Sequence, residues 1–124
     1  MPESAFRAAL RRQDGVPVID LLGEVNAAAE PELDVAFAEA IRPGPGTVLL
    51  NFEHVTYMNS TGIALIVGLL AQARKARLQL LVCGLTEHYR HIFNITRLAD
   101  FMSIHDDEAS AIATATVPAA EATE

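Results

Sequence analysis

The chain of 124 residues is long enough for one domain with its own hydrophobic core. Its composition is 51% hydrophobic but only 6% aromatic, with no tryptophan, which is typical of an aliphatic core in a compact α/β protein. Nine basic and sixteen acidic residues give a net charge of −7, which disfavours nucleic acid or an anionic membrane as the main partner.

A cytoplasmic location is expected. The one cysteine, Cys83, cannot form an internal disulfide, and no charged-then-apolar leader begins the chain. The longest apolar run, residues 63–71, is too short to span a bilayer, so we expect no direct insertion into a membrane.

The N-terminal residues predict a β-hairpin. Residues 5–12 alternate well enough for a strand, residues 16–22 form a second apolar run, and Asp14-Gly15 between them is a hairpin turn signal. A short amphipathic helix over the first run also fits, but the neighbouring turn favours two strands.

A helix is predicted after the hairpin. Gly23-Glu24 is expected to end the second strand. Residues 30–42 have apolar residues at helical spacing, and Pro31 suits the first turn of a helix. The Pro-Gly-Pro-Gly stretch at 43–46 then ends that helix.

The chain is organised around residues 48–71, where a short strand predicted over 48–52 is followed by a polar turn and a long helix. The helix is expected to start at Asn59, Ser60 and Thr61, whose side-chain oxygens can accept hydrogen bonds from the first turn. Apolar spacing predicts one face of Ile63, Ile66, Val67 and Leu70, and a second face of Leu65 and Leu69. Such a helix is either buried on both sides or offers one face to a partner.

Two further strand-helix steps follow. Residues 78–83 predict an apolar strand, and Thr86 can cap a helix that ends at Asn94. Residues 101–104 predict a last short strand, and the acids at 106–108 suit the start of a final helix.

The element order predicts an α/β fold with one mixed sheet, made of an N-terminal hairpin and then parallel β-α units, with about four helices packed on it. We expect residues 1–115 to form a single domain and residues 116–124 a flexible C-terminal tail. Ligands of such sheets bind beyond the carboxyl ends of the strands, so the turn at 54–61 and the loop after Gly23 should form the functional edge.

Ser60 is the main candidate for a functional side chain. It is predicted at a helix N-terminus, where free N–H groups and a partial positive charge favour an anion. A phosphate on Ser60 would add close to two negative charges and would disrupt an apolar surface docked over the turn. Simple capping of the helix is the alternative, and local chemistry does not decide between the two.

Neither hydrolysis nor metal binding is predicted. The turn is similar to a G-x-S-x-G nucleophile elbow, but Met58 stands where that motif needs a small residue. His88 and His91 are three residues apart on a predicted helix, which without further ligands favours two solvent-facing side chains. We therefore expect no enzymatic activity, no metal and no other cofactor.

Three stretches resemble the signature stretches of STAS domains, most closely those of anti-sigma factor antagonists. They are Gly23-Glu24-Val25-Asn26, the stretch from Leu50 to Ile63, and Leu81-Val82-Cys83-Gly84. The second is quite specific, because the family has an acid, a serine or threonine pair, a glycine and an aliphatic residue there. The resemblance covers roughly residues 5–115 and implies the STAS fold.

The resemblance also implies a partner-switching protein of bacterial signalling, in transcription regulation and stress response. Unphosphorylated, the protein would bind an anti-sigma factor that is a serine kinase of the histidine-kinase-like ATPase type, and would thereby free a sigma factor. Phosphorylation of Ser60, with Thr61 as the second choice, would release it, and a phosphatase would reset the cycle. The implied partner-binding residues are Glu24, Asn26, Asn59, Ser60, Thr61, Gly62, Ile63, Leu65 and Leu69.

Two asparagines depart from the family pattern. Asn59 precedes the serine where aspartate is usual, and Asn26 stands where another acid is usual. The loss of both acids favours an alternative, a STAS subunit that acts without phosphorylation. Such a subunit would be a scaffold in a stress-signalling complex or a cytoplasmic component of a lipid transporter. The sequence leaves homodimer formation open.

Overall fold

The structure, a computed structural model, describes residues 6–42, 44 and 46–115 of the 124. The elements are, in chain order, β1 (Arg7–Gln13), β2 (Val16–Val25), the 3-10 helix η1 (Ala27–Ala29), α1 (Glu30–Ile41), β3 (Thr47–Met58), α2 (Ser60–Lys75), β4 (Gln79–Cys83), α3 (Glu87–Ile95), the 3-10 helix η2 (Leu98–Phe101), β5 (Ser103–His105) and α4 (Glu108–Ala115). The predicted tail, residues 116–124, lies outside the described residues.

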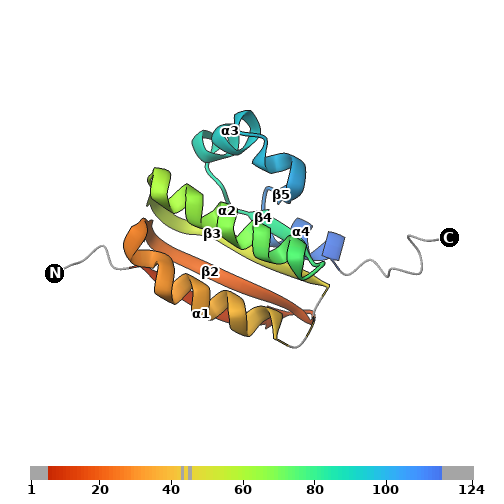
Figure 1. The fold of residues 1–124 in the computed structure, drawn as a ribbon. Coiled ribbons are helices and arrows are strands. Elements are labelled where there is room, and N and C mark those ends of the chain that lie inside the picture. Colours follow the sequence, from red (N-terminus) through yellow and green to blue (C-terminus); the bar gives the residue numbers. More distant parts are fainter. Residues whose placement is uncertain (1–5, 43, 45, 116–124) are drawn as a thin grey trace.

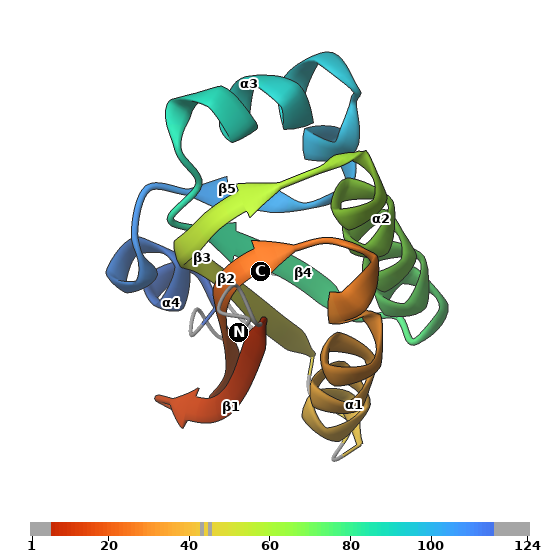
Figure 2. The same cartoon turned by 90° about the vertical axis from the view of Figure 1, so that its left-hand side faces the viewer.

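The five strands form one mixed sheet in the order β1-β2-β3-β4-β5. Helices α1 and α2 run side by side on one face of the sheet (Figure 1). Figure 2 shows α4 on the opposite face and α3 at the top of the view, above the sheet. The predicted α/β fold and element order are confirmed.

The N-terminal hairpin is also confirmed, and the helical alternative is wrong over residues 6–12, the described part of that stretch. β1 pairs with β2 in antiparallel register, whereas β2, β3, β4 and β5 pair in parallel. Asp14 and Gly15 have positive φ angles of 54° and 82°. Two positive φ angles give the two-residue turn whose twist matches the flanking strands.

Two strands extend further than the sequence predicted. β2 continues through Gly23-Glu24 to Val25, and β3 continues to Met58. Each extension is stabilised by pairing with the other, with two register shifts that mark β-bulges. The polar turn predicted at 54–61 is therefore mostly strand, and a single residue separates its end from α2.

The main core lies between the sheet and the two helices α1 and α2. The residues of α2 that it buries differ from the predicted faces of this helix. The buried set is Ile66, Leu69, Leu70 and Ala73, together with Gly62 in the first turn. Val67 is 41% exposed, whereas Leu69 is 1% exposed. The i, i+3, i+4, i+7 series that faces the sheet starts at Ile66, one helical turn later than predicted.

On the face of the sheet that α4 covers, Arg11 links the N-terminal hairpin to α4. Its guanidinium donates hydrogen bonds to Asp20 (Nε to Oδ2, 2.6 Å) and to Glu108 (Nη2 to Oε1, 2.6 Å). Asp20 also accepts a hydrogen bond from Nδ2 of Asn51 at 2.9 Å. The hydrogen bond from Arg11, with a smaller contribution from Asn51, holds the pKa of Asp20 below its usual range.

This network predicts a loss of stability in acid. Because the pKa of Asp20 is lower in the folded than in the unfolded chain, its contribution is present above the unfolded value of about 3.9 and lost as the pH falls through the folded value. At pH 7, Asp20→Asn should lower the free energy of unfolding by about 1–3 kcal/mol. The difference from the wild type should shrink below about pH 4. Urea denaturation across this pH range measures it.

Asp34→Asn is the matched control for Asp20→Asn. Asp34 is an exposed acid on α1 whose side chain has no hydrogen bond or ion pair with any residue in the described ranges. Its replacement should leave the free energy of unfolding nearly unchanged. Equal losses for the two variants at pH 7 would contradict a specific role for the Arg11–Asp20 pair.

Candidate functional site

The candidate site lies where β2 and β3 end and α2 begins, at the left of Figure 1. The N–H of Asn59 donates a hydrogen bond to the carbonyl of Val25 at 3.3 Å. Gly62 packs directly on the same strand end, since a Cβ at this position would lie 1.9 Å from the oxygen of Val25. The end of β2 and the start of α2 are therefore in contact.

Asn59 is the N-cap of α2. Its Oδ1 accepts a hydrogen bond from the N–H of Gly62 at 2.8 Å, and its carbonyl accepts from the N–H of Ile63 at 2.9 Å. The helix start predicted at 59–61 is thus confirmed. Within the described part of the chain, the N–H groups of Ser60 and Thr61 have no acceptor, as is usual in a first helical turn.

The hydroxyl of Ser60 is exposed and takes no part in capping. The side chains of Ser60 and Thr61 are both exposed, and neither has a hydrogen-bond partner among residues 6–42, 44 and 46–115. Because Asn59 performs the capping, helix capping does not account for Ser60. The hydroxyl is free to react with another molecule, and it lies at the positive end of the helix dipole.

Asn26 also acts as a helix cap. Its Oδ1 accepts a hydrogen bond from the N–H of Ala28 at 3.0 Å, and its Nδ2 donates to Oε1 of Glu24 at 3.4 Å. Asparagine and aspartate cap helices about equally well. Asn26 and Asn59 therefore supply capping contacts without a negative charge.

The remaining predicted partner-binding residues differ in burial. Ile63 and Leu65 are half-buried, whereas Leu69 is 1% exposed and Gly62 is buried against Val25. Leu69 and Gly62 thus pack within the protein itself, whereas Ile63 and Leu65 keep part of their surface exposed. The helical register that faces the sheet, described above, is the reason.

An uncharged surface extends from Ser60 along α2 and was not identified from the sequence. It consists of the exposed residues Tyr57, Ser60, Thr61, Ala64, Val67, Gly68 and Ala71. No Asp, Glu, Lys or Arg occurs from residue 54 to residue 73, although charged residues make up 20% of the chain. This absence of charge on an exposed helix face was the available signal.

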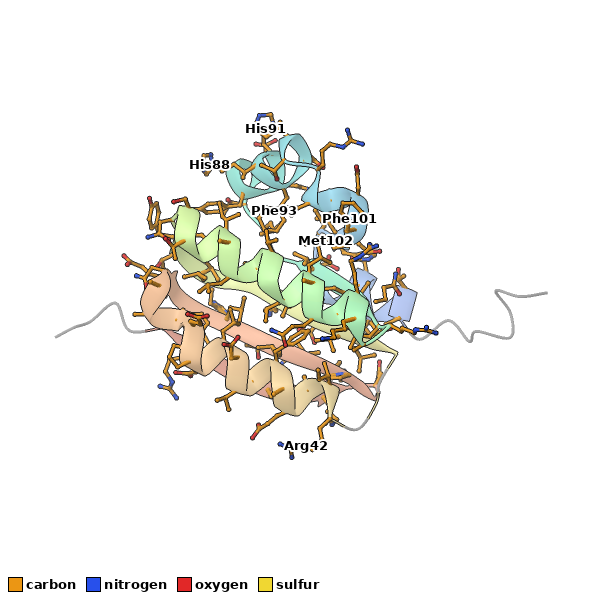
Figure 3. All side chains as sticks on the ribbon, in the orientation of Figure 1. Arg42, His88, His91, Phe93, Phe101 and Met102 are labelled. Atoms are coloured by element: carbon orange, nitrogen blue, oxygen red, sulfur yellow. The ribbon has the colours of Figure 1, made fainter. Side chains whose placement is uncertain are left out.

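Helix α3 contacts β3 through two buried aromatic residues, Tyr89 and Phe93. The hydroxyl of Tyr89 accepts a hydrogen bond from the N–H of Met58 at 2.9 Å and donates to its carbonyl at 3.3 Å. Phe93 extends from α3 toward the sheet, and its ring lies edge-on to Phe52 with centroids 6.2 Å apart (Figure 3). The sequence does not reveal these pairs because their members are far apart in the chain.

The remaining candidate groups are two histidines and the single cysteine. His88 and His91 are exposed on the outer side of α3, as predicted (Figure 3). Burial raises the pKa of Cys83 to about 12, so its thiol stays protonated at neutral pH. In the described ranges, no three His, Cys, Asp or Glu residues are grouped as a metal site would need. No helix there has the length and hydropathy needed to span a membrane.

Comparisons with known proteins identify the family. Residues 7–111 match the model of the STAS domain. The anti-sigma-B factor antagonist of Staphylococcus aureus is 30% identical over 94 residues, which cover 76% of this chain and 87% of that protein. A crystal structure of an anti-sigma factor antagonist from Mycobacterium paratuberculosis has a TM-score of 0.79 at 17% identity, covering 92% of this chain and 97% of that one.

The Bacillus cell fate determinant SpoIIAA, in its phosphorylated form, has a TM-score of 0.66 at 24% identity. The match covers 89% of this chain and 98% of SpoIIAA. These likenesses confirm the predicted STAS fold. With the matching family model and the relative from S. aureus, they show that the chain belongs to the STAS domain family and is related to its anti-sigma factor antagonists.

Proposed function

We propose that the protein is an anti-sigma factor antagonist that binds its anti-sigma factor through the uncharged surface and is released when Ser60 is phosphorylated. The observation that carries the proposal is the exposed hydroxyl of Ser60, unused in capping, at one end of that surface. The relative from S. aureus, named an anti-sigma-B factor antagonist, supports the class of partner.

A phosphate on Ser60 would have opposite effects on the fold and on docking. The N–H groups of Ser60 and Thr61 and the helix dipole would stabilise nearly two negative charges at this position. A partner docked on the uncharged surface would instead have to bury those charges without a counter-ion. Phosphorylation would therefore prevent binding and leave the fold intact. SpoIIAA, which shares this fold, has been solved in a phosphorylated form.

In this proposal the anti-sigma factor is also the serine kinase, of the histidine-kinase-like ATPase type, and a phosphatase restores the unmodified protein in the cytoplasm. Docking would place Ser60 beside the nucleotide of the kinase. Because Asn59 carries no charge, it repels a phosphate on Ser60 less than an aspartate would. Glu24, held against Asn26, and the half-buried Ile63 and Leu65 would form the rim of the docking surface.

A second candidate is a STAS subunit that acts without phosphorylation, as a scaffold in a stress-signalling complex or as a cytoplasmic component of a lipid transporter. The observation in its favour is the absence of a carboxylate at Asn26 and Asn59. A kinase that needs either carboxylate to orient its magnesium ion or the serine hydroxyl would modify Ser60 slowly.

The intact mass of the protein from its own cells distinguishes these candidates. It is to be measured for the wild type, Ser60→Ala and Thr61→Ala, in growing and in stressed cultures. We expect one phosphate on the wild type and on Thr61→Ala, none on Ser60→Ala, and an occupancy that changes under stress. A phosphate missing only from Thr61→Ala would move the site to Thr61. No phosphate under any condition would favour the scaffold or transporter subunit.

A further inference from the structure

β3 ends without a neighbouring strand on one side. β4 pairs with β3 only as far as Asn51, opposite Cys83, whereas β3 continues to Met58 with β2 alone beside it. Along a strand, successive residues direct their N–H and C=O groups to opposite sides. Since the N–H of Asn59 bonds to Val25 on β2, both backbone groups of Met58 face the side where β4 has ended.

The hydroxyl of Tyr89 satisfies both of these groups. It accepts a hydrogen bond from the N–H of Met58 at 2.9 Å and donates one to the C=O of the same residue at 3.3 Å. Tyr89 is 9% exposed, and its own N–H donates to Oγ1 of Thr86, the N-cap of α3, at 3.3 Å. The ring of His88 lies against it, with centroids 4.9 Å apart. One buried hydroxyl therefore takes the place of the missing strand.

The anchored residue is the last one before the cap of α2. Met58 is 3% exposed, and a Cβ at Gly62 would lie 3.1 Å from its Cγ, so Met58 also touches the first turn of the helix. The start of α2 is thus held from two sides, by Val25 of β2 and by Tyr89 of α3. Removal of either contact would leave Ser60 on a helix start fixed from one side only.

We propose that Tyr89 is a positioning residue for Ser60. Its hydroxyl holds the end of β3, and with it the Asn59 cap and the first turn of α2, in the arrangement that the kinase recognises. The part of this inference that concerns phosphorylation rests on the proposed function. The part that concerns the position of the helix start is independent of it.

Tyr89→Phe tests the inference because it keeps the ring and removes only the hydroxyl. In the isolated protein, hydrogen exchange of the hydrogen-bonded amides of Met58, Asn59 and Gly62 should become about tenfold faster. Ile112→Val is the matched control, since it removes one methyl group from the core under α4 and causes a comparable loss of stability. Equal exchange at Met58 in the two variants would overturn the inference.

Occupancy of the Ser60 phosphate in the protein's own cells provides the functional readout. Tyr89→Phe should carry several-fold less phosphate than Ile112→Val at matched stability, which a merely stabilising role would not produce. Equal occupancy in the two variants would overturn the role of Tyr89 in phosphorylation. If the wild type itself carries no phosphate, the proposed function fails, and the exchange comparison decides whether Tyr89 positions the helix start.

Discussion

Replacing Ser60 with aspartate is expected to weaken binding of the anti-sigma factor by roughly 30- to 1,000-fold, or about 2–4 kcal/mol. The added carboxylate would lie at the N-terminus of α2, where free N–H groups and the helix dipole stabilise negative charge. The free energy of unfolding should therefore change little. A docked partner, however, would have to remove water from the new carboxylate, and the surrounding surface offers no counter-ion to it.

Ser60→Asn is the matched control for Ser60→Asp, because the two new side chains have nearly the same size and only one is charged. Titration calorimetry with the anti-sigma factor identified from the protein's own cells should give an affinity for Ser60→Asn close to that of the wild type. Equal losses in the two variants would show that size, not charge, prevents docking. Unchanged binding of Ser60→Asp would exclude Ser60 from the docking surface.

The start of α2 could be predicted from the sequence because its signals are local. A residue with a side-chain acceptor precedes an uninterrupted apolar helix, and Asn59 makes the expected hydrogen bond to the third residue of that helix. The Asp14-Gly15 turn is equally local, since two adjacent residues determine its geometry. Strands that alternate with helices then limit the fold to a few topologies.

The extended ends of β2 and β3 could not be predicted because each exists through pairing with the other. The apolar run of β3 stops at Phe52, and most of the residues that follow are exposed. Two bulges further disturb the alternation on which strand prediction depends. The bond from Tyr89 to Met58 joins residues far apart in the chain, so no local pattern indicates it.

The rotation of α2 about its axis was the other property that the sequence left undetermined. Val67 and Leu69 are both apolar, and the helix is apolar over most of its circumference. Periodicity alone then fits more than one orientation, and packing against the sheet selects the one with Leu69 buried and Val67 exposed. The uncharged surface follows from that orientation.

Gly62→Ala is expected to lower the free energy of unfolding by about 3 kcal/mol. The new Cβ would lie 1.9 Å from the oxygen and 2.7 Å from the carbonyl carbon of Val25. These are backbone atoms at the paired end of β2, so they cannot rotate away as a side chain would. The gain of about 1 kcal/mol in helix propensity on replacing glycine by alanine is smaller than this cost.

Gly68→Ala in the same helix isolates the effect of this close approach, because a Cβ there would meet nothing within 4 Å. We expect Gly68→Ala to raise the free energy of unfolding by about 0.5–1 kcal/mol, through helix propensity and a less flexible unfolded chain. Urea denaturation of both variants shows whether the free energy of unfolding rises or falls in each. If Gly62→Ala were also stabilising, α2 would not rest on the end of β2, and Val25 would not help to position Ser60. A loss confined to Gly62→Ala would show that the backbone contact with Val25 determines where the helix, and therefore the serine, begins.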